Sequence, residues 1–457
     1  MKRFIKSIFI FSFIISNFAY STDSYIIKFK TTQRIQQIQK TYNVEFKAIF
    51  PQSKQLINSD KLQSVQYQIN ELNKYYVVKN SSDLLKIASD PDIELIEPNY
   101  IYHIEKINIP NDSLFAKQWA LQAINAQEAW QKATGKGIVI GFVDTGIDFT
   151  HPDLINQLAI NPKEDINHDG IFEPWSSDEV RNGVSGDLNG IDDDGNGYVD
   201  DVIGYDFVDE NTAYFGDWSN PDPIPEDEFG HGTSVAGVMA AEGNNQIGII
   251  GLAYNSKVLS ARAFDIGGAG EADDIAQSIL YLALNGAKII NCSFGDYFKS
   301  QLVEDAINLA QQLGCIIVAS SGNGSRSDPH FPSDYEGVIS VGGSTQEGQV
   351  WAGSNYGVNL ALIAPAINIM ATDRNNTYQE VSGTSFAAPY VSAAIALLLE
   401  QDPSLTSNEI RSLLMITAQK LNSDGWNVRY GSGILDIANA LNYVGKSAME
   451  IKSPKQF

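Results

Sequence analysis

The chain has 457 residues, enough for two or three domains of which one holds a large core. Acidic residues exceed basic ones, with 55 Asp and Glu against 31 Lys and Arg, and the net charge is −24. A chain this negative repels phosphate, so we do not expect nucleic acid as a partner.

The N-terminus has the pattern of a secretory signal peptide. Met1-Lys2-Arg3 and Lys6 precede an apolar run from Ser7 to Ile15, and small residues follow at Ala19-Tyr20-Ser21. The run is too short to span a bilayer, so we expect residues 1–21 to be a signal and the protein to be secreted, outside the cell or into the periplasm. An N-terminal membrane anchor is the alternative. No later segment favours stable membrane insertion.

The next segment, residues 22–108, differs in composition from the rest. A strand-like run at Tyr25–Phe29 is followed by a Gln-rich helical pattern over Thr32–Tyr42. Further elements are expected at Lys74–Val78, Ser82–Ser89 and Glu94–Glu97. This order predicts a small α+β domain, an open sheet with two helices on one face. It contains no Cys and no clustered His, so we expect no chemistry of its own there.

From Lys136 onward, apolar strands alternate with helices. The expected strands are Ile138–Val143, Val258–Ala263, Lys288–Phe294 and Ile316–Ala319, and the expected helices include Glu271–Asn285 and Gln301–Leu313. Such alternation predicts an α/β domain with a parallel sheet covered on both faces. Cys292 and Cys315 each lie in an apolar run, which favours buried thiols over a disulfide bridge.

Polar side chains fall where ligands of such sheets gather, at the carboxyl ends of the strands. Asp144 ends a strand, Asn323 lies in a strand-end turn, and His231 lies between two glycines. Ser385 opens a helix of small and apolar residues, whose free N–H groups favour an oxyanion. Taken alone, Ser385 is equally consistent with a structural N-cap. An Asp, a His and a Ser on one parallel sheet form a more specific set.

Three motifs carry a resemblance to a known family. Asp144-Thr145-Gly146-Ile147-Asp148, Gly230-His231-Gly232-Thr233 and Gly383-Thr384-Ser385-Phe386-Ala387-Ala388-Pro389 resemble, in this order, the signatures of the subtilisin-like serine proteases. The resemblance spans about Trp119 to Leu441. It implies a three-layer catalytic domain in which Asp144 orients His231, His231 is the general base and acid, and Ser385 attacks the substrate carbonyl. Asn323 would donate a hydrogen bond to the oxyanion, beside the Ser385 backbone N–H.

The resemblance also implies a cleft for protein or peptide substrates. The first specificity pocket would be lined by Ser293, Phe294 and Gly295 and by Ala319–Gly322, which includes Ser321 and Gly322. Gly268 and Gly270 would offer an edge for strand addition. Residues 22–108 would be a ferredoxin-like inhibitory propeptide removed by self-cleavage, residues 109–445 the catalytic domain and residues 446–457 a tail. We expect a monomer.

The sequence also bears on two other function classes. A catalytically silent relative that only binds peptides is the alternative, although no triad position is lost. A lipase or esterase is excluded because Gly383-Thr384-Ser385-Phe386-Ala387 lacks the Gly-x-Ser-x-Gly elbow.

Acidic residues concentrate in an insertion, residues 162–207, that the smallest family members lack. Between His151 and Gly230 there are 21 Asp and Glu against only Lys163 and Arg181. Two loops there have oxygen-bearing side chains at alternate positions, followed by a glycine turn, as at the start of an EF-hand loop. The first loop comprises Asp192, Asp194, Asn196, Tyr198 and Asp200, and a second repeats the spacing with Asp165, Asn167 and Asp169.

Position twelve of the first loop is Ile203 rather than Glu, so the loop is not a complete EF-hand. The local excess of carboxylates nevertheless favours a cation. We expect structural Ca²⁺ in the insertion, with a solvated acidic surface as the alternative.

Overall fold

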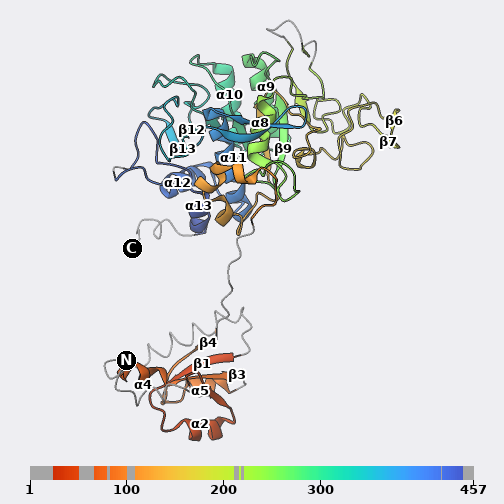
Figure 1. The fold of residues 1–457 in the computed structure, drawn as a ribbon. Coiled ribbons are helices and arrows are strands. Elements are labelled where there is room, and N and C mark those ends of the chain that lie inside the picture. The colour runs from red at the N-terminus through yellow and green to blue at the C-terminus, as the bar shows by residue number, and fades with distance from the viewer. Residues whose placement is uncertain are drawn as a thin grey trace. The chain divides into compact units, whose positions relative to one another are not determined.

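The computed structural model describes residues 24–50, 66–79, 83–99, 109–209, 216–217, 221–423 and 425–445. The chain divides into two compact units, Met1–Lys106 and Ile107–Phe457 (Figure 1). The expected signal segment 1–21 and the tail 446–457 lie outside the described residues. Among the described residues, no helix is long and apolar enough to cross a membrane.

The N-terminal unit contains a four-stranded antiparallel sheet in the order β2-β3-β1-β4. Its elements are β1 Ser24–Phe29, α2 Ile35–Tyr42, β2 Phe46–Ala48, α4 Gln66–Leu72, β3 Tyr75–Lys79, α5 Leu84–Ala88 and β4 Ile93–Pro98. Helices α2 and α5 bury Ile38 and Ile87 in one cluster with Ile27 and Phe29 of β1. Because residues two apart on a strand share a face, both helices cover the same face of the sheet. This is the ferredoxin-like arrangement that the sequence predicted.

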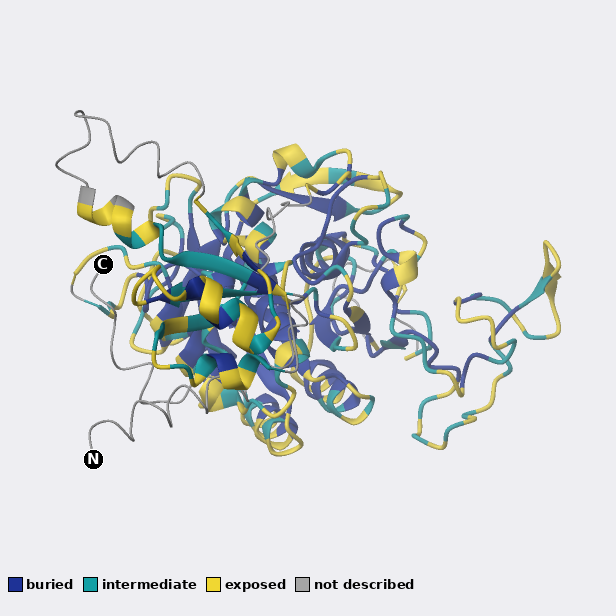
Figure 2. Ribbon diagram, turned by 90° about the horizontal axis from the view of Figure 1, so that it is seen from below, coloured by how far each residue is buried: buried dark blue, intermediate teal, exposed yellow. Residues whose placement is uncertain are grey.

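The second unit is organised around a seven-stranded sheet in the order β13-β12-β11-β10-β5-β9-β8. All six strand pairs are parallel, as predicted. The strands are β5 Val139–Asp144, β8 Gly204–Asp206, β9 Lys257–Arg262, β10 Ile289–Cys292, β11 Ile316–Ser320, β12 Ile339–Ser344 and β13 Leu360–Pro365. Figure 2 shows the buried residues in dark blue along the central strands and the exposed ones in yellow on turns and outer helix faces.

Helices cover both faces of this sheet. Ile140 and Phe142 of β5 join one apolar cluster and Val143 joins the other, because successive side chains of a strand point to opposite faces. The first cluster includes residues of α6 Trp119–Ala123, α7 Ala126–Ala129, α8 His231–Ala240, α11 Thr384–Gln401, α12 Ser407–Thr417 and α13 Ile437–Tyr443. The second includes residues of α9 Ala272–Leu284 and α10 Gln301–Gln312. The result is the predicted three-layer α/β domain.

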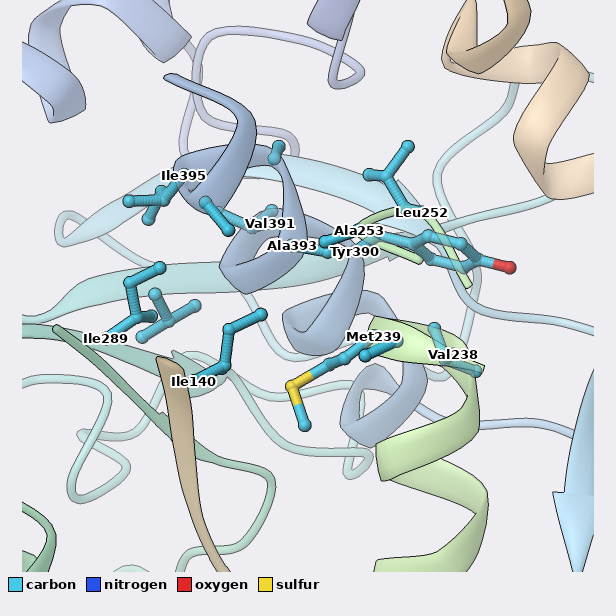
Figure 3. Close-up of a cluster of buried hydrophobic side chains, with 14 of the residues drawn as sticks. Ile140, Val238, Met239, Leu252, Ala253, Ile289, Tyr390, Val391, Ala393 and Ile395 are labelled. Carbon is cyan, nitrogen blue, oxygen red and sulfur yellow. The ribbon is translucent and has the colours of Figure 1, made fainter. Parts of the chain in front are cut away.

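Helix α11 is the central helix of the first layer. Tyr390, Val391 and Ile395 pack beside Met239 of α8 and Ile140 of β5 in the core (Figure 3). Such a helix is apolar on all sides because it is buried on all sides. Burial on this scale holds the first turn of α11 in a fixed position over the sheet.

The acidic insertion consists mostly of turns and extends away from the sheet, where Figure 1 labels its one hairpin. That hairpin is β6 Val180–Arg181 with β7 Val184–Ser185, and β8 follows it. A second hairpin, β14 Ile369–Asp373 with β15 Thr377–Val381, precedes α11. The two cysteines are buried free thiols, as expected.

Candidate active site

The structure brings Asp144, His231 and Ser385 into one cleft of about 450 Å³. Asp144 is the last residue of β5, His231 the first residue of α8 and Ser385 the second residue of α11. The sheet thus places three residues that are far apart in the sequence at the carboxyl end of its central strands. Asn323 lines the same cleft.

The Asp144 carboxylate fixes the tautomer of His231. Asp144 Oδ1 lies 2.7 Å from His231 Nδ1 and also accepts the Thr145 backbone N–H at 2.8 Å. Because a carboxylate only accepts, Nδ1 carries the proton and Nε2 keeps its lone pair. Burial lowers the pKa of His231, but the charge of Asp144, its hydrogen bond and the charge of Asp227 raise it by more, so the pKa is raised overall.

Asp227 connects the loop of Asp144 with the loop of His231. Its buried carboxylate accepts from Thr145 Oγ1 at 2.8 Å and from Thr233 Oγ1 at 2.6 Å. It also accepts the backbone N–H groups of Phe229, Gly230 and Thr233. A negative charge at this place is stabilised by the N-terminus of α8. The sequence analysis missed Asp227, because it lies between Glu226 and Glu228 in an acidic run and no motif distinguishes it from them.

Close approach of the two loops depends on one glycine. A Cβ on Gly232 would lie 2.1 Å from the carbonyl oxygen of Gly146 and 3.2 Å from the Asp144 Cβ. The first of these distances is shorter than any real Cβ contact. Glycine at this position therefore lets α8 begin directly against the Asp144 loop.

A proline shapes the backbone at Ser385. Pro389 lies inside α11, four residues after Ser385, and has no N–H to donate to the Ser385 carbonyl. That carbonyl instead accepts a hydrogen bond from Ser293 Oγ at 2.7 Å. Ser293 Oγ in turn accepts from Asn291 Nδ2 at 2.8 Å. The start of α11 is thus joined to the end of β10.

Asn323 is held by the residue before Ser385. Its Oδ1 accepts the Thr384 backbone N–H at 2.8 Å and the Thr384 hydroxyl at 2.9 Å. Gly383 has φ 152° and ψ 157°, a region that only glycine adopts readily, and a Cβ there would lie 3.5 Å from Asn323 Nδ2. With Oδ1 occupied, the NH₂ group of Asn323 remains as the donor in the cleft.

Some of the residues that were predicted to contact substrate line the cleft, and others do not. Ser293, Phe294, Gly295, Gly268 and Gly322 line it, whereas Gly270 and Ser321 do not. Ser320, within the predicted segment Ala319–Gly322, also lines it. The structure adds residues that were not predicted there: Thr145, Phe229, Phe264, Tyr297, Gly324 and His330. Their contribution depends on tertiary contacts rather than on any local motif.

The two acidic loops have closely similar backbone geometry. In each, the first Asp accepts the N–H of the glycine five residues later: Asp165 Oδ2 from Gly170 at 3.0 Å and Asp192 Oδ2 from Gly197 at 2.8 Å. The side chains at the third position, Asn167 and Asp194, and at the fifth position, Asp169 and Asn196, each accept the backbone N–H two residues on. Asp200 instead accepts the backbone N–H groups of residues 189 and 190, which joins the end of its loop to the residues just before the loop.

Buried carboxylates that the sequence analysis did not select surround these loops. Glu164 and Asp201 are two of them: one carboxylate oxygen of each, and one of the predicted and only partly buried Asp194, lie within 4.8 Å of one another. Burial raises the pKa of Glu164 to about 7 and that of Asp201 to about 6, and neighbouring carboxylates add to the rise. Asp187, beside the other loop, has its pKa raised to about 7, first by burial and then by the charges of nearby Glu173 and Asp165.

Three oxygens in these clusters are buried and accept no hydrogen bond from the described residues: Glu164 Oε2, Asp165 Oδ1 and Asp187 Oδ1. Buried polar atoms normally have partners. Carboxylate and carbonyl oxygens are the ligands that Ca²⁺ prefers, so the donor set fits calcium.

A further acidic group, Asp206, Asp217 and Asp222, already has a cationic side chain beside it. The buried guanidinium of Arg262 donates to the Asp206 carboxylate and, at 2.8 Å, to Glu228. Burial raises the pKa of Asp206 to about 8, and the charge of Arg262 opposes that rise. Through Glu228, which precedes His231 by three residues, this group is linked to the segment that leads to His231.

Comparisons with known proteins agree with this geometry. Residues 135–433 match the peptidase model described as the subtilase family. A thermophilic serine proteinase from Bacillus sp. (strain AK1) is 32% identical over 378 residues, which cover 80% of this chain and 79% of that protein. Thermitase from Thermoactinomyces vulgaris is 30% identical over 335 residues, covering 73% of this chain and 99% of that protein.

Among solved structures, a protease from Pseudoalteromonas arctica matches with a TM-score of 0.59 and 27% identity, over 73% of this chain and 99% of its own. The family match covers more than half of the chain and includes the Asp144, His231 and Ser385 motifs in their order. The chain therefore belongs to the subtilase family and is a serine-type endopeptidase.

Proposed function

We propose that the protein hydrolyses peptide bonds through Asp144, His231 and Ser385 by way of an acyl-enzyme. The observation that carries this proposal is the short contact of 2.7 Å between Asp144 Oδ1 and His231 Nδ1. It leaves Nε2 as the only proton acceptor of the ring, in the cleft that Ser385 also lines.

In the proposed reaction, Ser385 Oγ attacks the substrate carbonyl carbon while Nε2 of His231 takes the hydroxyl proton. The carbonyl oxygen becomes an oxyanion, which accepts from Asn323 Nδ2 and the Ser385 backbone N–H. His231 then gives its proton to the leaving amine as the C–N bond breaks. Water, deprotonated by the same nitrogen, hydrolyses the ester and restores Ser385. Asp144 stabilises the imidazolium in both halves.

We infer that the protein is made as a secreted, self-processed precursor. Residues 1–21 would be the signal, residues 22–108 an inhibitory propeptide and residues 109–445 the catalytic domain. The ferredoxin-like sheet of the N-terminal unit supports the propeptide role, since it is a small compact domain without catalytic side chains. We expect the mature enzyme to be a monomer acting on protein or peptide substrates.

Calcium is proposed as a structural ion of the insertion. One site would use Asp192, Asp194 and Asn196 together with Glu164 and Asp201, and Tyr198 and Asp200 belong to the same loop. The other would use Asp165, Asn167, Asp169 and Asp187. The ion would supply positive charge to carboxylates that burial otherwise forces toward protonation.

Labelling tests the catalytic proposal. A fluorophosphonate is expected to label the purified enzyme at Ser385, and Ser385→Ala is expected to lose labelling, peptide hydrolysis and cleavage of the precursor. Thermal melting of the variant provides the control for folding. A Ser385→Ala protein that still processes itself at the wild-type rate would show that Ser385 is not the nucleophile.

A further inference from the structure

The cleft contains one buried titratable side chain for which the proposed reaction has no use, His330. It is 6% exposed and follows β11 in the segment that leads to β12. Phe331, the next residue, forms a β-bridge with Asp296 through hydrogen bonds of 2.9 and 2.8 Å. This bridge holds His330 against the wall formed by Ser293–Gly295.

Hydrogen bonds settle the tautomer of His330. Ser333 Oγ donates its only proton to the His330 carbonyl oxygen at 2.9 Å, so it must accept from His330 Nδ1, 3.2 Å away. The proton is therefore on Nδ1 and the lone pair is on Nε2. Burial lowers the pKa of His330, although Asp334, Asp296 and the Gly295 backbone oppose this, so the ring is neutral in mildly alkaline buffer.

The imidazole fills the space between the two expected walls of the specificity pocket. A Cβ on Gly295 would lie 2.3 Å from Cε1 of His330, and a Cβ on Gly322 would lie 2.8 Å from Nε2. The ring edge with Nε2 therefore faces the point where the two glycine walls meet. The imidazole thus occupies volume at this end of the cleft that a large aromatic side chain would otherwise use.

Tyr297 completes this end of the cleft. Its ring packs on His330 with centroids 5.5 Å apart and an interplanar angle of 74°. Its hydroxyl accepts from Asn355 Nδ2 at 3.1 Å, which leaves the phenolic proton available to donate. The end of the cleft thus offers one acceptor, His330 Nε2, and one donor, Tyr297 Oη.

We propose that His330 selects the residue before the scissile bond, and that the pocket prefers a carboxamide side chain, glutamine or asparagine, to an apolar or large aromatic one. A carboxamide donates through its NH₂ to Nε2 and accepts through its oxygen from Tyr297. An apolar side chain of equal size leaves both groups unpaired, which a site built for hydrogen bonding rejects strongly. A substrate carboxylate is disfavoured, because its negatively charged oxygen would face the lone pair of Nε2. The inference rests on the proposed peptidase function of the cleft.

Four peptides that differ only in the residue before the cleaved bond test this preference: glutamine, methionine, glutamate and phenylalanine. The kcat/KM of each is measured at pH 8 and normalised to the fraction of enzyme that a fluorophosphonate labels. For the wild type we expect glutamine to exceed methionine by about tenfold, the effect of one net hydrogen bond. Glutamate and phenylalanine should be poorer than glutamine.

Two variants separate hydrogen bonding from shape. His330→Phe keeps a ring at this position but removes the acceptor, so the advantage of glutamine over methionine should disappear. His330→Gly opens the pocket, so phenylalanine should become the best of the four. Melting curves identify any variant that fails to fold.

The proposal is overturned if the wild type does not favour glutamine over methionine, or if a folded His330 variant keeps the wild-type ranking. In either case, labelling and hydrolysis would still support the peptidase function. If the wild type neither labels nor cleaves any peptide, the proposed function itself fails, and the proposal for His330 fails with it.

Discussion

Asn323 and Thr384 form a pair of hydrogen bonds that orients the carboxamide beside the proposed nucleophile. Both the N–H and the hydroxyl of Thr384 donate to Asn323 Oδ1, at 2.8 and 2.9 Å. Thr384 Oγ1 in turn accepts the Gly322 N–H at 3.1 Å. The donor group of Asn323 is therefore positioned before substrate binds, as electrostatic stabilisation of a transition state requires.

Asn323→Leu should lower kcat by about 10²–10³, the range found when one oxyanion donor is removed from subtilisin. KM should change little, because the negative charge on oxygen develops only in the transition state. Steady-state kinetics with one peptide substrate measures both constants. Thr384→Val should have a smaller effect of the same kind, whereas Thr384→Ser keeps the hydroxyl and serves as the matched control. A loss confined to KM would mean that Asn323 only binds substrate.

Asp227→Asn should shift the acidic limb of the pH profile of kcat/KM to lower pH. His231 works as a base only when it is neutral, so activity falls as the pH drops through its pKa. The charges of Asp144 and Asp227 raise that pKa. Removing the charge of Asp227 destabilises the imidazolium, lowers the pKa and preserves activity at lower pH.

Glu226→Gln is the control for this prediction, because Glu226 is the exposed neighbour of Asp227 and loses the same charge. It should leave the acidic limb in place. If Asp227→Asn folds and the acidic limb of its pH profile does not shift, Asp227 has only a structural role.

Ser293→Ala should destabilise the start of α11, because the Ser385 carbonyl loses its donor and Pro389 cannot replace it. An unpaired buried carbonyl costs about 1–3 kcal/mol of unfolding free energy. Adding Pro389→Ala supplies an N–H four residues after Ser385 and should recover part of that loss. Denaturant unfolding of both single variants and the double variant measures the coupling. If the loss of unfolding free energy in the double variant equals the sum of the two single losses, the coupling between Ser293 and Pro389 does not exist.

Apolar periodicity was sufficient to predict the α/β layers and the small sheet of the N-terminal unit, because each element is encoded in a continuous stretch of sequence, as the apolar run of α11 shows. The cleft around Ser385 was predicted from three motifs through their resemblance to a known family. Strand β2, Phe46–Ala48, escaped prediction because its three residues are too few to show a period.

Single residues that act through tertiary contacts could not be predicted in the same way. Asp227 and His330 matter because of what folding brings to them, and neither stands in a spacing that distinguishes it from a surface residue. Glu164 and Asp201 flank the EF-hand-like spacing rather than follow it, although both are buried in the fold. Ser321 and Gly270, predicted to contact substrate, do not line the cleft, although Ser320 of the same predicted segment as Ser321 does.

The buried carboxylates of the insertion predict how calcium and pH affect stability together. Burial raises the pKa of Glu164 to about 7 and of Asp201 to about 6, above their ordinary values of 4.5 and 3.8. Between those values the folded protein binds more protons than the unfolded chain, so the free energy of unfolding falls as pH rises. Enzyme from which a chelator has removed calcium should therefore melt at a lower temperature at pH 8 than at pH 5. Calcium should reverse the loss at pH 8.

Glu164→Gln combined with Asp201→Asn should remove most of the calcium response. A ligand at a hundredfold excess over its Kd stabilises the folded form by about 2.7 kcal/mol, which corresponds to a rise in Tm of roughly 4 °C for a domain of this size. The double variant needs no cation to neutralise these two groups, so its Tm should change little on adding Ca²⁺ or a chelator. Asp178→Asn, an exposed position in the same insertion, is the matched control and should respond like the wild type. A double variant with the full wild-type response would place the ion elsewhere and leave this cluster as an acidic surface without a metal.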